Sequence, residues 1–288
     1  MTTQAQTLSA GARFYKALEQ ERPLLLPGAI NGYCARMAEH EGFRALYLSG
    51  GGVAAAMGLP DLAVIDLHDV AADAARITQV SQLPLLVDAD TGFGSPLNIN
   101  RAVKTLSAAG VAGLHLEDQS FLKRCGHRPN KALVSADEMA ARLNAAAEAR
   151  TDDLFIIMAR TDALASETRE QAVARAVAYV AAGADMLFVE AAQTLDDYRA
   201  FKDACPQTPL LANITEFGKT PLFAADEIAA AGVDIMLFPL SAFRAMNQAA
   251  LSVYRTIRKD RSQNAVLQTM QTREALYDYL DYHAQRKK

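Results

Sequence analysis

Eight short apolar runs recur along this chain of 288 residues, and a longer segment with helical periodicity separates nearly every pair of them. Strands that are buried on both faces appear as continuous apolar runs rather than as alternating ones. An alternation of this kind predicts a parallel sheet, and eight units are the number that closes a (β/α)8 barrel. The predicted strands are Leu24–Ile30, Ala45–Ser49, Leu83–Asp88, Gly113–Glu117, Phe155–Arg160, Met186–Glu190, Pro209–Ile214 and Ile235–Leu240.

Glycines mark where three of the intervening helices should end. Gly110, Gly183 and Gly232 each close an alanine-rich stretch, where a left-handed C-cap is required. Two segments lie outside the eight units: Leu8–Gln20 predicts a helix that covers the barrel bottom, and Gln263–Gln285 predicts a helical tail. No linker rich in Pro, Gly or Ser divides the chain, so we expect a single domain over residues 1–288.

Charge and cysteine content narrow the classes of function. The formal net charge of −4 argues against binding to nucleic acid, which requires clustered positive charge, but leaves an anionic small molecule open as a substrate. An odd, sparse set of cysteines (Cys34, Cys125 and Cys205) suits a reducing compartment. The polar N-terminus has no secretory pattern and no apolar run reaches the roughly 18 residues of a membrane span. We therefore expect a cytoplasmic protein without a membrane partner.

An unusually polar set of residues follows the apolar strands. In such barrels the chemistry is built at the C-terminal ends of the strands. Carboxylates at these positions are costly to bury without a partner, and a divalent cation would relieve that cost. The strand-end residues are Ser49, Gly50, Gly51, Gly52, Asp88, Asp90, Glu117, Asp118, Arg160, Asp162, Glu190, Asn213, Thr215, Ser241 and Arg244.

The third strand end carries two carboxylates separated by one residue, Asp88 and Asp90. In a regular strand both side chains would point the same way. Together with Glu117 from the adjacent strand they suit Mg²⁺, which prefers a few carboxylates plus water and substrate oxygens. The alternative is that Asp88 caps a loop and Asp90 opens the turn at residues 91–94.

Two loops could complete a site. The turn Ser49–Gly52 is either a flexible connection or an anion-binding turn, because glycine lets backbone N–H groups approach an anion closely. The loop Lys123–Lys131 places Cys125 among lysine, arginine and histidine, a field that favours thiolate and makes the thiol a usable acid, base or nucleophile. Its alternative is a solvated basic hairpin. Cys34 and Cys205 have no such field, and we interpret them as structural.

At this point the chain resembles a known family. Lys123–His127 (KRCGH) is similar to the K-[KR]-C-G-H signature of the lyase branch of the isocitrate lyase and phosphoenolpyruvate mutase superfamily. The resemblance covers nearly the whole chain, although the chain is too short for isocitrate lyase itself. Its other segments are Tyr47–Gly52, Asp88–Asp90, Met158–Asp162, Leu211–Glu216, Pro239–Asn247 and Met270–Arg273.

The resemblance implies a Mg²⁺-dependent (β/α)8-barrel lyase that cleaves 2-methylisocitrate to pyruvate and succinate in the methylcitrate cycle. It implies Mg²⁺ on Asp88 and Asp90, with Glu117 reached through water. Cys125 would be the general acid, Tyr47 the base and Arg160 a source of positive charge. It further implies a homotetramer that exchanges its eighth helix between subunits. The substrate-binding residues implied are Ser49, Gly50, Gly51, Lys123, Gly126, His127, Arg160, Glu190, Asn213, Thr215, Arg244 and Arg273.

The methyl group of that substrate needs apolar walls. Phe188 stands two residues before Glu190 and Leu237 two before Pro239, so in regular strands both would face the barrel mouth. The alternative is that both fill the barrel core.

Rival functions remain open. Sister lyases that act on dimethylmalate, oxaloacetate or isocitrate could share these motifs. A class I aldolase needs a strand-end lysine for its Schiff base, and the predicted strand ends offer none. A binding barrel without catalysis would not need an activated thiol beside a metal site.

Overall fold

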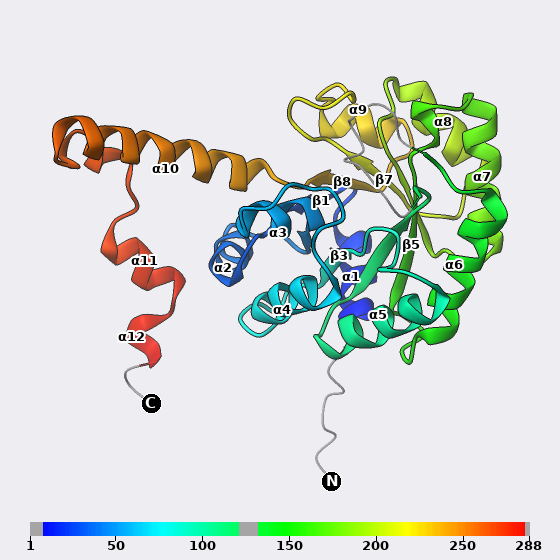
Figure 1. Ribbon diagram of the computed structural model, residues 1–288, viewed down its shortest axis with the longest axis horizontal. Coiled ribbons are helices and arrows are strands. Elements are labelled where there is room, and N and C mark those ends of the chain that lie inside the picture. The colour runs from blue at the N-terminus through cyan, green and yellow to red at the C-terminus, as the bar shows by residue number, and fades with distance from the viewer. Residues whose placement is uncertain (1–7, 121–131, 286–288) are drawn as a thin grey trace, which may run out of the picture.

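The computed structural model describes residues 8–120 and 132–285, and in it the predicted barrel is present (Figure 1). Eight parallel strands pair in the order β1-β8-β7-β6-β5-β4-β3-β2, and a bridge between Gly28 and Tyr47 joins the two ends. All eight lie within or within one residue of the predicted runs. They are β1 (Leu24–Pro27), β2 (Leu46–Leu48), β3 (Leu85–Asp88), β4 (Gly113–Glu117), β5 (Ile156–Thr161), β6 (Met186–Val189), β7 (Leu210–Asn213) and β8 (Ile235–Phe238).

Helices surround the strands, and short polar side chains begin many of them. Ser9, Ser135 and Thr168 each accept a backbone N–H of the first helical turn, which satisfies a donor that the helix leaves open. Gly110, Gly183 and Gly232 have the positive φ predicted for them. The helices are α1 (Ala10–Gln20), α2 (Gly32–His40), α3 (Gly50–Ala56), α4 (Leu67–Thr78), α5 (Pro96–Ala108), α6 (Ala136–Ala149), α7 (Arg169–Ala181), α8 (Leu195–Ala204), α9 (Ala225–Ala230), α10 (Ser241–Asp260), α11 (Arg273–Tyr279) and α12 (Tyr282–Gln285), with 3₁₀ turns η1 (Ala163–Ala165) and η2 (Asn264–Thr269).

The apolar core has two parts. One fills the barrel interior with side chains such as Leu26, Leu86, Met158 and Leu211, and the other lies between the strands and the outer helices. Both faces of the strands are therefore buried, which is why the strands appear in the sequence as unbroken apolar runs.

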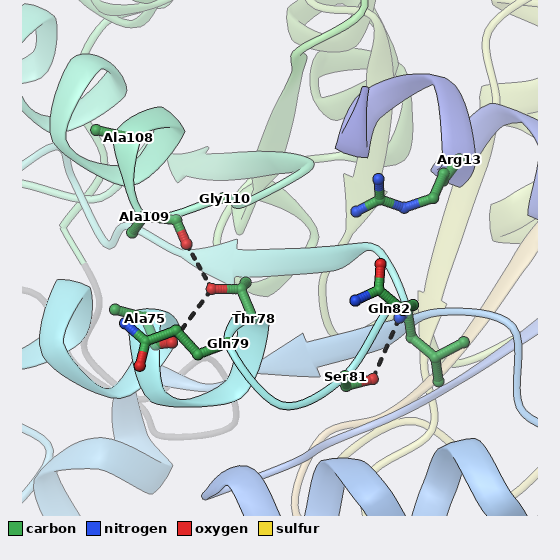
Figure 2. Close-up of a pocket in the computed structure, with 10 residues that line it drawn as sticks. Arg13, Ala75, Thr78, Gln79, Ser81, Gln82, Ala108, Ala109 and Gly110 are labelled. Atoms are coloured by element: carbon green, nitrogen blue, oxygen red, sulfur yellow. Dashed lines mark hydrogen bonds between the residues drawn. The ribbon is translucent and has the colours of Figure 1, made fainter. Parts of the chain in front are cut away.

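Helix α1 covers the bottom of the barrel, as predicted. Phe14, Ala17 and Leu18 of this helix belong to the interior cluster. Beside it, a cavity of about 270 Å³ lies among Arg13 and the C-terminal ends of α4 and α5 (Figure 2). Thr78 spans the two helix ends here by donating to the carbonyls of Ala75 and Ala109. This cavity lies at the opposite end of the strands from the polar residues.

The C-terminal part of the chain leaves the barrel. Helix α10 extends away from β8, and α11 and α12 continue beyond α2 (Figure 1). Tyr279 of the tail contacts α2 through ring contacts with Tyr33 and His40. None of the 20 residues of α10 is buried. No helix in the described part of the chain is long and apolar enough to cross a membrane.

Candidate active site

The polar residues predicted at the strand ends are brought together at the C-terminal mouth of the barrel. Six carboxylates are buried there, which is far from the usual surface position of such groups. They are Asp88, Asp90, Glu117, Asp118, Asp162 and Glu190. Neighbouring strands supply them, because β3, β4, β5 and β6 pair in sequence order.

Asp88 and Asp90 converge by a route that strand alternation does not describe. Strand β3 ends at Asp88, and Asp90 has a left-handed φ of 47°. The prediction that both side chains point the same way because they lie in one regular strand was therefore wrong. Both carboxylates nevertheless lie beside Gly50. The Asp90 backbone N–H donates to Asp88 Oδ1 at 3.1 Å, which closes the turn.

Gly50 packs against both carboxylates. Its N–H donates to Asp88 Oδ2 at 3.1 Å. A Cβ at this position would lie 3.2 Å from Asp88 Oδ2 and 3.4 Å from Asp90 Oδ1, so a side chain here would crowd the pair. The segment Ser49–Gly52 is not a flexible connection, which was one of the two interpretations of its glycines. Ser49 is the N-cap of α3, and Gly50 to Gly52 form its first turn.

Arg160 is the central cation of the described site. Its Nε and Nη2 bind the two oxygens of Asp162 at 3.0 and 3.2 Å, and its Nη1 lies 3.5 Å from Glu117 Oε2. Burial lowers the pKa of Arg160, but the ion pairs with Asp162, Glu117 and Glu190 outweigh burial and hold the pKa well above its ordinary value. The guanidinium is thus a permanent positive charge.

Tyr47 meets a residue that the sequence reasoning missed. Its hydroxyl lies 2.9 Å from Nε2 of His115, which is buried in β4 and lies 3.5 Å from Asp88 Oδ1. Burial is the largest cause that lowers the pKa of His115, to about 4, and burial followed by Asp88 raises the pKa of Tyr47 well above its ordinary value. Both groups are therefore neutral at pH 7. His115 stands two residues before Glu117 in an apolar run, a signal that could have identified it.

A second missed residue is Asp61, between α3 and α4. A Cβ on Gly51 would lie 3.1 Å from its Oδ2, so another carboxylate borders the glycine turn of α3. Nothing in the apolar pattern marks a loop aspartate of this kind.

The predicted apolar walls lie inside the barrel. Phe188 and Leu237 are both members of the interior cluster, as the core alternative expected. Phe188 also reaches the site, because its ring centre is 5.1 Å from the Arg160 guanidinium carbon and 5.1 Å from the His115 ring. Phe188 therefore packs in the barrel core and also contacts two residues of the site.

Strands β6 and β7 contribute a hydrogen-bonded pair. The Asn213 side-chain nitrogen lies 3.1 Å from Glu190 Oε2, and Thr215 is buried just beyond. Ser241 donates to Glu216, and Arg244 Nε lies 3.6 Å from Glu216 Oε2. Arg273 begins α11 in the tail, so the single chain does not bring it to this cluster (Figure 1).

Lys123, Cys125, Gly126 and His127 lie outside the described residues. Both stems of their loop are described. Gln119 and Leu133 form an antiparallel bridge, and Ser120 N donates to Ala132 O at 2.7 Å. The described residues on either side of this segment are therefore paired with each other just beyond the end of β4.

The donor set fits Mg²⁺. Among the described side chains, no three His, Cys, Asp or Glu residues converge as a complete ligand set. Mg²⁺ does not require one, since it commonly uses one or two carboxylates and keeps several waters. Asp88 and Asp90 are buried, lie side by side at Gly50 and offer carboxylate oxygens, the ligands that Mg²⁺ prefers.

Comparison with known proteins agrees with this geometry. The family model described as phosphoenolpyruvate phosphomutase matches residues 14–258. The chain is 57% identical over 279 residues to the 2-methylisocitrate lyase of Shewanella oneidensis, covering 96% of this chain and 95% of that protein. It is 56% identical over 282 residues to the 2-methylisocitrate lyase of Escherichia coli K12, covering 97% of this chain and 95% of that protein.

A solved structure extends the comparison to the fold. A 2,3-dimethylmalate lyase, itself a member of the PEP mutase/isocitrate lyase superfamily, superposes with a TM-score of 0.90 at 34% identity, covering 98% of this chain and 94% of that chain. Because relatives above half identity extend over almost the whole length, the comparison includes every strand end described above. The chain is an enzyme of the 2-methylisocitrate lyase family, within the PEP mutase/isocitrate lyase superfamily.

Proposed function

We propose that this enzyme cleaves 2-methylisocitrate to pyruvate and succinate in the methylcitrate cycle of propionate degradation. The identity to 2-methylisocitrate lyases over nearly the full chain is the observation that carries the proposal. The reaction is a retro-Claisen cleavage of a tertiary alcohol, and it needs a site that withdraws charge from the alcohol oxygen. The sparse cysteines support a cytoplasmic location, where thiols stay reduced.

In this proposal Asp88 and Asp90 hold Mg²⁺, and Glu117 is linked to it through water. The metal would supply a Lewis acid at the alcohol oxygen and the neighbouring carboxylate. Glu117 and Asp88 are already oriented by the protein, since Arg160 lies beside the first and Gly50 donates to the second. The predicted role of Ser49, Gly50 and Gly51 is to hold that substrate carboxylate.

Arg160 and Tyr47 are the protein side chains that would act on the alcohol oxygen of the substrate. The fixed charge of Arg160 favours the negative charge that develops there. Tyr47 is a neutral phenol, so it can take the alcohol proton only by passing its own proton on. Nε2 of His115, at 2.9 Å, is the nitrogen that would receive it in the tautomer with a proton on Nδ1.

Cleavage leaves a carbanion on the succinate half, and Cys125 is the proposed general acid that protonates it. Glu190, Asn213, Thr215 and Arg244 would hold the carboxylates of that half, together with Lys123, Gly126, His127 and Arg273. The Glu190–Asn213 pair supports this assignment, because a buried amide oriented by a carboxylate is a fixed donor.

A sister activity is the second candidate, because the structural neighbour described above is named a 2,3-dimethylmalate lyase. The greater identity to 2-methylisocitrate lyases favours the first candidate. A panel of 2-methylisocitrate, 2,3-dimethylmalate, oxaloacetate and isocitrate separates them by kcat/KM.

We also propose that the enzyme is a homotetramer that exchanges α10 between subunits. Helix α10 leaves its own barrel with no buried residue, although it carries apolar side chains such as Met246, Leu251, Tyr254 and Ile257. Exposed apolar residues along a long helix support a protein partner. A neighbouring tail could bring Arg273 to the mouth of a second barrel, which the single chain does not do.

The metal assignment predicts reversible loss of activity. Excess chelator should abolish pyruvate release, and added Mg²⁺ should restore it, because the alcohol oxygen then regains its Lewis acid. Asp90→Ala should stay inactive at every Mg²⁺ concentration tested. Full turnover in excess chelator would contradict the metal mechanism.

The acid assignment predicts a different pattern. Cys125→Ser should lower kcat by at least about 100-fold while substrate binding is largely retained, because a serine hydroxyl is a far weaker acid. Cys34→Ser and Cys205→Ser are the matched controls and should keep most of their activity. Single-turnover kinetics and calorimetry measure the two effects, and a near-normal kcat for Cys125→Ser would exclude the acid role.

Selectivity for the methyl group should be measurable but incomplete. Burying one methyl stabilises by about 0.8 kcal/mol, and a shaped pocket discriminates one methylene by roughly 10–200-fold in kcat/KM. We expect 2-methylisocitrate to be preferred over isocitrate within that range. Equal kcat/KM for the two substrates would reject the assignment at the level of substrate and leave the lyase chemistry standing.

The tetramer is tested by mass in solution. Sedimentation of the full chain should give four subunits, and truncation after Leu240 should lower that number because it removes α10 and the tail that follows it. A monomer at micromolar concentration would contradict the exchange of α10.

A further inference from the structure

The direction of the Arg160 side chain needs an explanation. Three carboxylates lie within reach of this guanidinium, with Asp162 at 3.0 Å, Glu117 at 3.5 Å and Glu190 at 3.9 Å. All three are negatively charged, so charge alone does not determine which of them Arg160 binds most closely. The bidentate geometry with Asp162 fixes the plane of the fork, so the orientation of Arg160 follows from the orientation of Asp162.

Asp118 holds the segment that carries Asp162. Its Oδ1 accepts the backbone N–H of Asp162 at 2.9 Å, and its Oδ2 accepts the Thr161 hydroxyl at 2.7 Å. Asp118 N also donates to Arg160 O at 3.2 Å. The carboxylate and the backbone N–H of Asp118, the residue after β4, thus bind three consecutive residues at the end of β5, Arg160, Thr161 and Asp162.

Helix α7 fixes Asp118 from the outside of the barrel. The Tyr179 hydroxyl donates to Asp118 Oδ2 at 2.9 Å, and Arg175 Nη1 lies 3.2 Å from that hydroxyl. Arg175 is itself held by both oxygens of Glu167 and donates to the Val134 carbonyl. Tyr179 on the outer helix α7 is therefore connected to the Arg160 guanidinium at the barrel mouth through Asp118 and Asp162.

We propose that Asp118, Thr161 and Tyr179 form a positioning brace that sets the direction of Arg160. Thr161 and Tyr179 both donate to the Asp118 carboxylate, and the same carboxylate accepts the backbone N–H of Asp162, which pairs with Arg160. The brace rests on the proposed function, because its effect is on the oxygen that Arg160 faces. A small displacement of such a charge is enough to slow a reaction severely.

Substitutions of single hydroxyls test the brace. Thr161→Val and Tyr179→Phe each remove one bond to Asp118, and we expect kcat to fall by about tenfold to a hundredfold while KM changes by less than about threefold. Thr161→Ser keeps the hydroxyl and should restore kcat. Thr78→Val is the matched control, because it removes a threonine hydroxyl bond at the barrel bottom (Figure 2) and should change thermal stability but not kcat.

A double-mutant cycle separates positioning from general stability. In an Arg160→Lys background the fork to Asp162 is already lost, so Tyr179→Phe should lower kcat by less than about twofold further. If Tyr179 contributed only to stability, Tyr179→Phe would lower kcat by the same factor in the unmodified enzyme and in the Arg160→Lys variant. The same factor in both, or a normal kcat for Thr161→Val, would overturn the brace.

A crystal structure of Thr161→Val gives a readout that needs no turnover. We expect the Arg160 guanidinium to leave the bidentate position on Asp162, and an unchanged pair would overturn the brace. If the unmodified enzyme releases no pyruvate from 2-methylisocitrate, the proposed function fails, and the position of Arg160 in the crystal still decides the brace.

Discussion

Burial of six carboxylates at one end of an apolar barrel is the constraint around which this structure is organised. Each charge removed from water carries a cost of several kcal/mol unless hydrogen bonds and opposite charges replace the solvent. The structure meets this cost differently at each position. Asp88 accepts backbone N–H groups, Asp118 accepts hydroxyls and a backbone N–H, and Asp162 binds Arg160. The carboxylates that face the mouth are thereby oriented before any ligand arrives.

Arg160 connects these parts. It pairs with Asp162, lies near Glu117 and Glu190, and stacks over Phe188. Because one guanidinium is shared among three strand ends, a change in any of them alters the field at the mouth. The outer helices gain a role in chemistry by this route, since Tyr179 and Arg175 on α7 hold the strand end from which Arg160 projects.

Much of the fold could be predicted because its signals are local. Strands buried on both faces leave unbroken apolar runs, and glycine is required at the left-handed helix ends Gly110, Gly183 and Gly232. Parallel strands end at one face, so the polar residues after them had to gather there. The family also followed from a short loop motif, Lys123–His127, whose residues lie outside those that the structure describes.

The missed features depend on contacts between distant segments. Asp90 reaches Asp88 through a left-handed turn, which a strand period does not describe. The Ser49–Gly52 segment begins a helix although three glycines disfavour one, because Ser49 caps it and Asp88 accepts the Gly50 N–H. His115 lies within an apolar strand, and its contact with Tyr47, from a strand distant in the sequence, shows that it belongs to the site. Arg273 begins α11 in the C-terminal tail, and no local pattern in the sequence shows that this tail leaves the barrel.

The proposed function is tested most directly by identifying the carbon–carbon bond that the enzyme breaks. Proton NMR of 2-methylisocitrate incubated with the purified enzyme and Mg²⁺ measures this directly. The account predicts pyruvate and succinate in equal amounts, with both signals absent when chelator is in excess. No change in the substrate signals, or conversion to any other pair of products, would contradict it.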